Sequence, residues 1–190
     1  MIRIFRNGLF LFFITLSQCV SAQQDYFLVE LETFSPGAKE MIAMMEGNSA
    51  EDFETVDLHG VKQKLSDYNG QFVLLWFWSI DDELSSGLID GLNLMHEIFE
   101  DELNLIGLAY DNRAELNDFV ANKNIDFSVI PNSLRIAELL YGSELGLGRI
   151  FLIDRQGIVT KAIPREFFIE NQNSFDQLRI LIQQLINEEN

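Results

Sequence analysis

Apolar residues change their spacing along the chain in a way that predicts strands alternating with helices. Residues 72–78 (FVLLWFW) and 103–110 (LNLIGLAY) are apolar at almost every position, which is typical of strands buried on both faces of a sheet. Between them, residues 81–100 carry apolar residues at helical spacing, which predicts an amphipathic helix. The residues on its apolar side are Leu84, Leu88, Leu92, Met95 and Phe99.

Shorter strands and helices are predicted on either side of this unit. The further strands are expected at residues 26–34, 53–58, 61–65, 127–130, 149–153 and 158–163. The further helices are expected at residues 36–45, 113–122 and 133–141, with a last helix starting at Ser174. The strands at 53–58 and 61–65 form a hairpin around His59-Gly60. This order predicts a mixed sheet with helices on both faces, because crossover connections are right-handed.

The first 22 residues have the pattern of a secretory signal peptide. Arg3 and Arg6 form a positive end, residues 9–16 (LFLFFITL) are apolar, and Val20-Ser21-Ala22 supplies the small residues before a cleavage site. The apolar run is too short to span a bilayer as a stable helix, although an uncut anchor helix is the alternative. We therefore expect an exported protein, periplasmic or secreted, with no membrane span after processing.

The single cysteine, Cys19, lies inside this leader. Cleavage after Ala22 removes it, so the exported chain is expected to carry no thiol. One cysteine excludes an internal disulfide, a CxxC redox pair and a cysteine-rich zinc site. Residues 16–19 (LSQC) leave a lipoprotein alternative open, in which Cys19 carries a lipid anchor, although Gln18 is a poor residue before a modified cysteine.

The composition is that of a folded and strongly acidic domain. Hydrophobic residues make up 47% of the 190 residues, enough for a sizeable core. The 13 Lys and Arg residues stand against 30 Asp and Glu residues, a net charge of −17, which excludes nucleic-acid binding through phosphate contacts. The length fits an N-terminal extension at residues 23–47 and one domain at residues 48–190.

Several short segments along the chain resemble sequence motifs of the thioredoxin superfamily. Residues 50–53 (AEDF) are similar to an opening AP-x-F phrase, 65–71 (LSDYNGQ) to a lead-in LsdlkGK, and 72–78 to the strand that delivers the active site. Residues 105–111 and 147–154 are similar to two later strands of the family. The branch it resembles is the exported redoxin-type proteins, with the cytochrome-c-maturation oxidoreductases and, more distantly, the peroxiredoxins. The resemblance implies a thioredoxin-like three-layer α/β/α sandwich with a mixed central sheet and an N-terminal β-hairpin.

The chemistry that this resemblance implies is missing from the sequence. Family enzymes carry a CxxC motif after the strand at 72–78, and its two cysteine positions match Asp82 and Ser85. The cis-proline that faces the motif in the family matches Gly148, where a trans bond is expected. Disulfide exchange needs a thiolate nucleophile, which neither Asp82 nor Ser85 provides. The peroxidatic cysteine of the peroxiredoxins is absent as well.

The resemblance also implies a groove beside these positions that holds an extended peptide. Trp78 lies near the end of its strand, so an exposed indole edge is expected at the groove. The residues expected to line the groove are Trp78, Ser79, Asp81, Leu147 and Arg149.

Three acidic residues, Asp81, Asp82 and Glu83, crowd the first turn of the predicted helix. A helix N-terminus stabilises carboxylates, so one of them is expected to cap the helix and the others to complement its dipole. A calcium site is the alternative, although calcium needs six or more oxygen ligands. Ser85 would be a nucleophile only with a base in reach, and neither His59 nor His96 has the expected placement.

These observations together predict an exported thioredoxin-like protein without redox cysteines. We expect a non-catalytic scaffold or binding module with an unidentified protein or peptide partner, and no cofactor or metal. One alternative is a family-type thiol–disulfide oxidoreductase or peroxide reductase in envelope redox homeostasis, which could act only with Cys19 retained. An acidic calcium-binding module is the other alternative.

Overall fold

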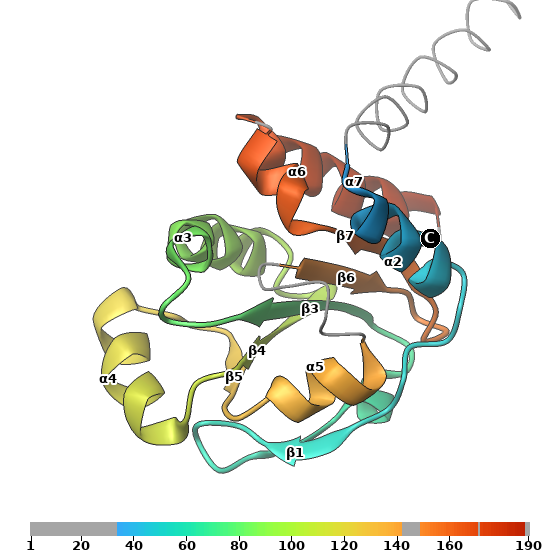
Figure 1. Ribbon diagram of the computed structural model, residues 1–190. Coiled ribbons are helices and arrows are strands. Elements are labelled where there is room, and N and C mark those ends of the chain that lie inside the picture. Colours follow the sequence, from blue (N-terminus) through green and yellow to red (C-terminus); the bar gives the residue numbers. More distant parts are fainter. Residues whose placement is uncertain (1–33, 142–148, 171, 189–190) are drawn as a thin grey trace, which may run out of the picture. The chain divides into compact units, whose positions relative to one another are not determined.

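A five-stranded mixed sheet lies at the centre of the molecule (Figure 1). The computed structural model describes residues 34–141, 149–170 and 172–188, and residues 36–190 form one compact unit. In spatial order the strands are β5 (Ser128–Ile130), β4 (Leu103–Ala109), β3 (Phe72–Trp78), β6 (Arg149–Ile153) and β7 (Val159–Ile163). The first three are parallel, whereas β6 and β7 are antiparallel to their neighbours, which confirms the predicted mixed sheet.

The apolar run of β3 explains its central place. All seven of its side chains are buried, and its backbone pairs with β4 along one edge and with β6 along the other. A strand that is covered on both faces and paired on both edges can be apolar at every position. The sequence therefore locates the middle of the sheet correctly.

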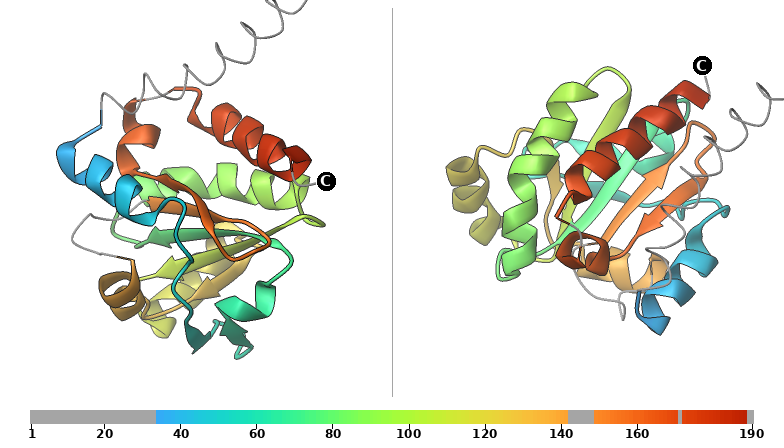
Figure 2. Two further views of the ribbon diagram at one scale, coloured as in Figure 1. Left: turned by 90° about the vertical axis from the view of Figure 1, so that its right-hand side faces the viewer. Right: turned by 90° about the horizontal axis from the view of Figure 1, so that it is seen from above.

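Helices cover both faces of this sheet (Figure 2). The helices α3 (Glu83–Ile98) and α7 (Ser174–Glu188) lie on one face, and α5 (Leu134–Leu140) lies on the other. The helix α4 (Arg113–Lys123) connects β4 to β5, and a short helix that the sequence did not predict, α6 (Arg165–Glu170), follows β7. This arrangement confirms the three-layer α/β/α architecture. Among the described helices, none combines the length and the apolar character needed to cross a membrane.

The residues before β3 form a helix and a hairpin. The helix α2 (Pro36–Met45) packs against β7, so part of the predicted extension at 23–47 lies against the sheet. The predicted hairpin is confirmed as β1 (Glu54–Val56) paired with β2 (Lys62–Lys64), and a 3-10 turn, η1 (Leu65–Tyr68), follows it. The strand expected at 26–34 lies outside the described residues except for Phe34.

The tip of this hairpin is built around the buried carboxylate of Asp57. Its Oδ1 accepts the backbone N–H groups of His59 and Val61, both at 2.9 Å, and its Oδ2 accepts the side-chain amide of Gln63 at 2.9 Å. The guanidinium of Arg113 on α4 donates to the carbonyl oxygens of Leu58 and Asp57. The Asp57 carboxylate thus fixes the conformation of the turn, and Arg113 anchors this turn to α4.

A stacked pair of tryptophans fills the core on one face of β3. The rings of Trp76 and Trp78 lie 4.9 Å apart and nearly parallel, and both side chains are fully buried. They fit because Gly107 on β4 has no side chain: a Cβ there would lie 3.0 Å from Nε1 of Trp78. The missing side chain at Gly107 therefore leaves room for the Trp78 ring.

The helices α3 and α7 approach each other closely at a second glycine. A Cβ on Gly91 of α3 would lie 2.2 Å from the ring of Phe175 on α7, closer than any real contact. Gly87, one turn earlier on α3, has open space around its own Cβ position. The missing side chain at Gly91 therefore makes the notch that receives Phe175.

Candidate functional site

The connection from β3 to α3 carries the positions that the resemblance matched to the CxxC motif. Asp82 is the N-cap of α3: its Oδ2 accepts the backbone N–H of Ser85 at 3.0 Å. The hydroxyl of Ser85 donates to the same oxygen at 2.6 Å, and Ser85 is fully buried. The capping role expected for this acidic turn is thus performed by Asp82, whereas Asp81 and Glu83 are exposed.

The other carboxylate oxygen of Asp82 is bound by a residue from the far end of the chain. Nη1 of Arg165, the first residue of α6, donates to Oδ1 of Asp82 at 2.6 Å. Burial raises the pKa of Asp82, but the hydrogen bonds from Ser85 and Arg165 lower it by more, so the pKa lies below its ordinary value. Asp82 is therefore a carboxylate at neutral pH, and both of its oxygens are engaged.

Asp111 holds the same connection from the neighbouring strand. Its side chain lies just beyond the end of β4 and accepts the hydroxyl of Ser79 at 3.0 Å and the backbone N–H of Ile80 at 2.9 Å. The two carboxylates of Asp82 and Asp111 thus fix both ends of residues 79–82. The site is a rigid loop whose polar groups bond to each other.

Two of the residues predicted to line the groove are buried instead. Trp78 has no exposed surface, because its ring stacks on Trp76 and contacts Phe119 of α4 at a centroid distance of 5.7 Å. The expectation of an exposed indole edge is therefore wrong: α4 covers the end of the strand.

Arg149 is the second of these buried residues. It is 1% exposed, with its guanidinium over the ring of Phe77 and its Nη1 donating to the carbonyl of Tyr141 at 3.0 Å. Its place on β6, opposite Phe77, turns it into the core. Of the other predicted lining residues, Ser79 is partly exposed, Asp81 is exposed and Leu147 lies outside the described residues, as does Gly148, the position matched to the cis-proline.

The geometry at the start of α3 fits a cap better than a calcium site. Both oxygens of Asp82 accept hydrogen bonds, and one of them faces a guanidinium, which competes with a cation for the carboxylate. Over the described ranges, no group of three or more His, Cys, Asp or Glu side chains is arranged to hold a metal ion.

Sequence reasoning missed Arg165 and Asp111. The position of Asp111 was open to inference, because it directly follows a buried strand parallel to β3, and the carboxyl ends of neighbouring parallel strands meet at one edge. Arg165 offered no such signal, since it lies 83 residues from Asp82 in a helix of six residues.

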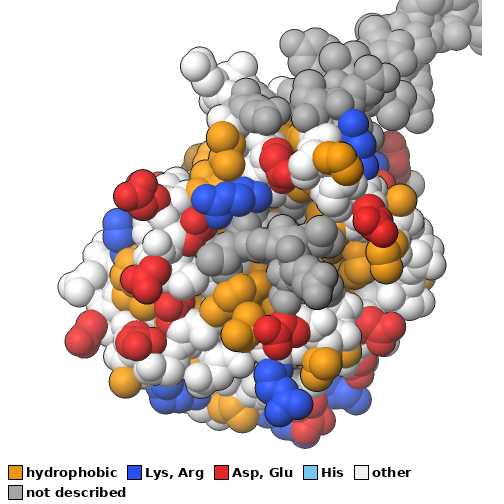
Figure 3. Space-filling view, viewed as in Figure 1, with side chains coloured by type: hydrophobic (Ala, Val, Ile, Leu, Met, Phe, Trp, Pro, Cys, Tyr) orange, Lys and Arg blue, Asp and Glu red, His pale blue; other side chains and the backbone are white. Residues whose placement is uncertain are grey.

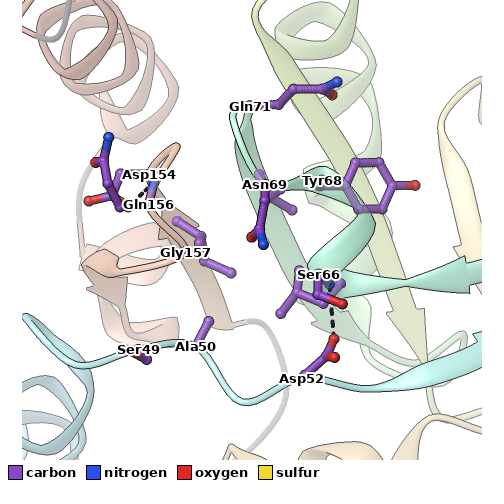
Figure 4. A pocket seen from close by; sticks show the side chains of 13 residues that line it. Ser49, Ala50, Asp52, Ser66, Tyr68, Asn69, Gln71, Asp154, Gln156 and Gly157 are labelled. Atoms are coloured by element: carbon purple, nitrogen blue, oxygen red, sulfur yellow. Dashed lines mark hydrogen bonds between the residues drawn. The ribbon is translucent and has the colours of Figure 1, made fainter.

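A pocket in the described part of the chain lies at the opposite end of β3 from this site (Figure 4). Gln71, just before β3, and Val73 in β3 line it together with residues of η1 and of the turn between β6 and β7. Its carboxylates are already bonded: Asp52 accepts the N–H of Ser66, and Asp154 accepts that of Gln156, both at 2.9 Å. The pocket is thus separate from the start of α3.

On the face of the molecule in Figure 3, the charged side chains form no single patch of one sign. On the face in Figure 3, acidic side chains are distributed around the outline with hydrophobic side chains between them. The most exposed large hydrophobic residues in the described ranges are Leu139 on α5 and Met44 on α2, 71% and 65% exposed. The fixed loop at the start of α3 therefore remains the best-defined candidate site.

Replacing Asp82 with alanine is expected to lower the free energy of unfolding by about 1–2 kcal/mol, because the cap of α3 is lost. A double-mutant cycle with Arg165→Ala isolates the ion pair, whose coupling is expected to be about 0.5–1 kcal/mol, since the Arg165 side chain is 35% exposed. Urea denaturation of the four proteins measures both quantities. Glu83→Ala is the matched control, and a loss as large as that of Asp82→Ala would show that general charge effects explain the result.

A model of the AhpC/TSA family matches residues 47–162 of this chain. A search of curated proteins found no match. Among solved structures, a peroxidoxin, BcpB, from Mycobacterium tuberculosis is similar with a TM-score of 0.63 and 18% identity, covering 74% of this chain and 98% of its own.

Two similar structures come from Bacteroides. A thiol:disulfide interchange protein from Bacteroides sp. has a TM-score of 0.62 and 19% identity, covering 75% of this chain and 90% of its own. The thioredoxin domain of a thiol-disulfide oxidoreductase from Bacteroides vulgatus has a TM-score of 0.60 and 18% identity, covering 72% and 96%. At these identities the likeness concerns the fold. Because the family model matches more than half of the chain, the protein belongs to the AhpC/TSA family, in the redoxin branch of the thioredoxin superfamily.

Proposed function

We propose that this protein is a redoxin-family module that has lost dithiol chemistry and binds a protein or peptide outside the cytoplasm. The observation that carries the proposal is the pair Asp82 and Ser85 at the start of α3, which are hydrogen-bonded to each other at the two positions that the resemblance matches to the CxxC cysteines. A carboxylate and a hydroxyl form no disulfide, and thiol–disulfide exchange proceeds through a thiolate and a mixed disulfide.

The arrangement of the site supports a structural use of these residues. Arg165 covers one oxygen of Asp82, and buried Ser85 donates to the other, so both groups stabilise the start of α3. What remains accessible beside them is the polar surface at Ser79, Asp81 and Glu83. Since Asp111 fixes this loop in advance, a partner that binds there meets a preorganised surface, which lowers the entropy cost of binding.

A family-type oxidoreductase is the competing function. The similar structures include a thiol:disulfide interchange protein and a thiol-disulfide oxidoreductase domain. In this chain such an activity would depend on Cys19, the single cysteine, which the sequence places in a leader. The two functions therefore make opposite predictions for the exported protein.

The purified protein is expected to show no turnover above the buffer blank in insulin reduction or in peroxide consumption. In a Cys19→Ser background, Asp82→Cys/Ser85→Cys is expected to form an internal disulfide and to gain insulin reductase activity, because a helix N-terminus favours the thiolate. The matched control is Leu94→Cys/Glu97→Cys, exposed positions with the same spacing further along α3, where no such activity is expected. Turnover by the unmodified chain would contradict the proposal and favour the oxidoreductase.

Partner binding has its own test. A photo-crosslinking residue at Asp81 or Glu83 is expected to capture a partner from an envelope fraction, whereas the same residue at Glu97, exposed on a later turn of α3, is expected to capture none. Equal capture from both places would mean that the loop is not the binding surface.

We also propose export with removal of the leader. Intact mass and N-terminal sequencing of the exported protein are expected to give a chain that begins at Gln23 and titrates no thiol. A chain that begins at Cys19 with added lipid mass would instead support the lipoprotein alternative. A full-length chain would support an uncut leader and would leave Cys19 in place.

A further inference from the structure

The outer edge of β7 is occupied by residues 46–50 of the same chain. Edge strands expose unpaired backbone groups, which proteins generally cover. Here the N–H of Gly47 donates to the carbonyl of Val159 at 2.8 Å, and the N–H of Val159 donates to the carbonyl of Asn48 at 2.9 Å. Ser49 and Ile158 form an antiparallel bridge. Residues 46–50, which we call the clasp, therefore act as a short sixth strand.

A bulge in β7 explains why the clasp also uses a side chain. Lys161 pairs with Leu152 and Val159 with Ile153, so Thr160 is the extra residue between them. This shift turns the N–H of Ala162 toward the edge, where Oε1 of Glu46 accepts it at 3.0 Å. Oε2 of the same carboxylate lies 3.5 Å from Nζ of Lys161.

The clasp comes early in the compact unit and is joined to the hairpin by a short connection. It continues from α2, which packs on β7 as well, and only Glu51 and Asp52, both exposed, separate it from the buried Phe53. The clasp thus lies on the N-terminal side of the hairpin and packs on β7 of its own chain. A second copy can therefore supply the same segment to β7, with the same hydrogen bonds, and a short hinge favours such exchange.

We propose that the β7 edge is an acceptor site for an extended segment carrying an acidic residue, and that the clasp of a second copy occupies it in a segment-exchanged dimer. In the exchanged dimer, residues 36–50 of each copy pack on the other copy. Every hydrogen bond between the clasp and β7 is then made between chains. The closed monomer and the exchanged dimer differ mainly at the hinge, so the dimer population rises with protein concentration.

A disulfide across the clasp tests this directly. In full-length Cys19→Ser protein, Ser49→Cys/Ile158→Cys places two thiols at directly paired positions, which suits disulfide geometry. Oxidation at low concentration is expected to give an internal bond. Oxidation after incubation at high concentration is expected to give a covalent dimer, its fraction roughly tenfold higher for a tenfold higher concentration while the dimer is scarce. Non-reducing gels and peptide mapping identify the bond.

The matched control is Glu54→Cys/Lys64→Cys, a paired position inside the β1–β2 hairpin that the exchange does not separate. It is expected to give the internal bond at every concentration. Internal bonds alone in the Ser49→Cys/Ile158→Cys protein would overturn the proposal, as would covalent dimers in the control. If the test variant does not fold, sedimentation of the Cys19→Ser protein decides, and a monomer at every concentration overturns the proposal. A dimer supports the proposal if Glu46→Ala speeds the exchange of subunits between dimers and Glu40→Ala leaves it unchanged.

Discussion

Gly91→Ala is expected to lower the free energy of unfolding by about 1–3 kcal/mol, because the added methyl group overlaps the ring of Phe175. The ring fills the notch between α3 and α7, so it can make room only by moving α7 or by leaving its place beside Phe168. Because Phe175 of α7 packs directly against the backbone at Gly91, the interface between α3 and α7 has no room for an added carbon. Chemical denaturation monitored by circular dichroism measures the loss.

Gly87→Ala is the matched control for this prediction, since it makes the same change one turn earlier in the same helix. The position has open space, and alanine favours a helix over glycine, so the variant is expected to gain about 0.5–1 kcal/mol. The two substitutions are thus expected to change stability in opposite directions. A loss at both positions would show that the backbone of α3, and not the contact with Phe175, sets the effect.

Asp57→Ala is expected to have the largest effect, a loss of about 2–4 kcal/mol in the free energy of unfolding. It leaves the buried side-chain amide of Gln63 without its acceptor, and the N–H groups of His59 and Val61, which lie on the exposed turn, lose theirs as well. Arg113 binds the carbonyl groups of the same turn, so the start of α4 is expected to loosen too. Asp118→Ala, at an exposed position on α4, is the control and is expected to change stability by less than about 0.5 kcal/mol.

The same carboxylate makes stability depend on pH. Burial raises the pKa of Asp57, but the hydrogen bonds from Val61, Gln63 and His59 lower it by more, so the folded pKa lies below the unfolded one. Its contribution is complete above about pH 4 and is lost as the pH falls through the folded pKa. The pKa values of Asp52 and Asp82 are lowered too and act with the same sign.

Denaturation from pH 7 downwards is therefore expected to show a loss of stability below about pH 4. Asp57→Asn keeps the shape of the side chain but removes its titration, so its curve is expected to be flatter in this range. A variant curve parallel to that of the unmodified protein would mean that other groups govern the acid transition.

The sequence predicted the centre of the fold better than its periphery. The bounds of β3, β6 and α2 agree with the prediction residue for residue, and those of β4 agree closely, because apolar runs and helical spacing are local signals. The helix α6 was missed, since its six residues are too few to show a period. The sequence left open how the residues before the hairpin pack, because the contacts of Glu46 with the β7 edge join residues 116 positions apart.

In the candidate site, too, features set by local sequence were predicted and features set by long-range contacts were not. The cap by Asp82 followed from a carboxylate at a helix start, which is local physics. The burial of Trp78 depends on where Phe119 of α4 lies, and the partner of Asp82 comes from α6, so neither could be read from spacing along the chain. Long-range contacts thus decide which of the predicted residues are accessible.

The tryptophan pair gives the protein a built-in optical probe. The chain contains two tryptophans, and these are the stacked rings of Trp76 and Trp78, fully buried on β3. All indole fluorescence therefore originates in one place, and the fixed packing of both rings gives a near-ultraviolet dichroism signal that is lost when this packing is lost. Tryptophan emission therefore reports changes in the core around β3. Movement of residues 46–50, which contain no tryptophan, needs a separate label.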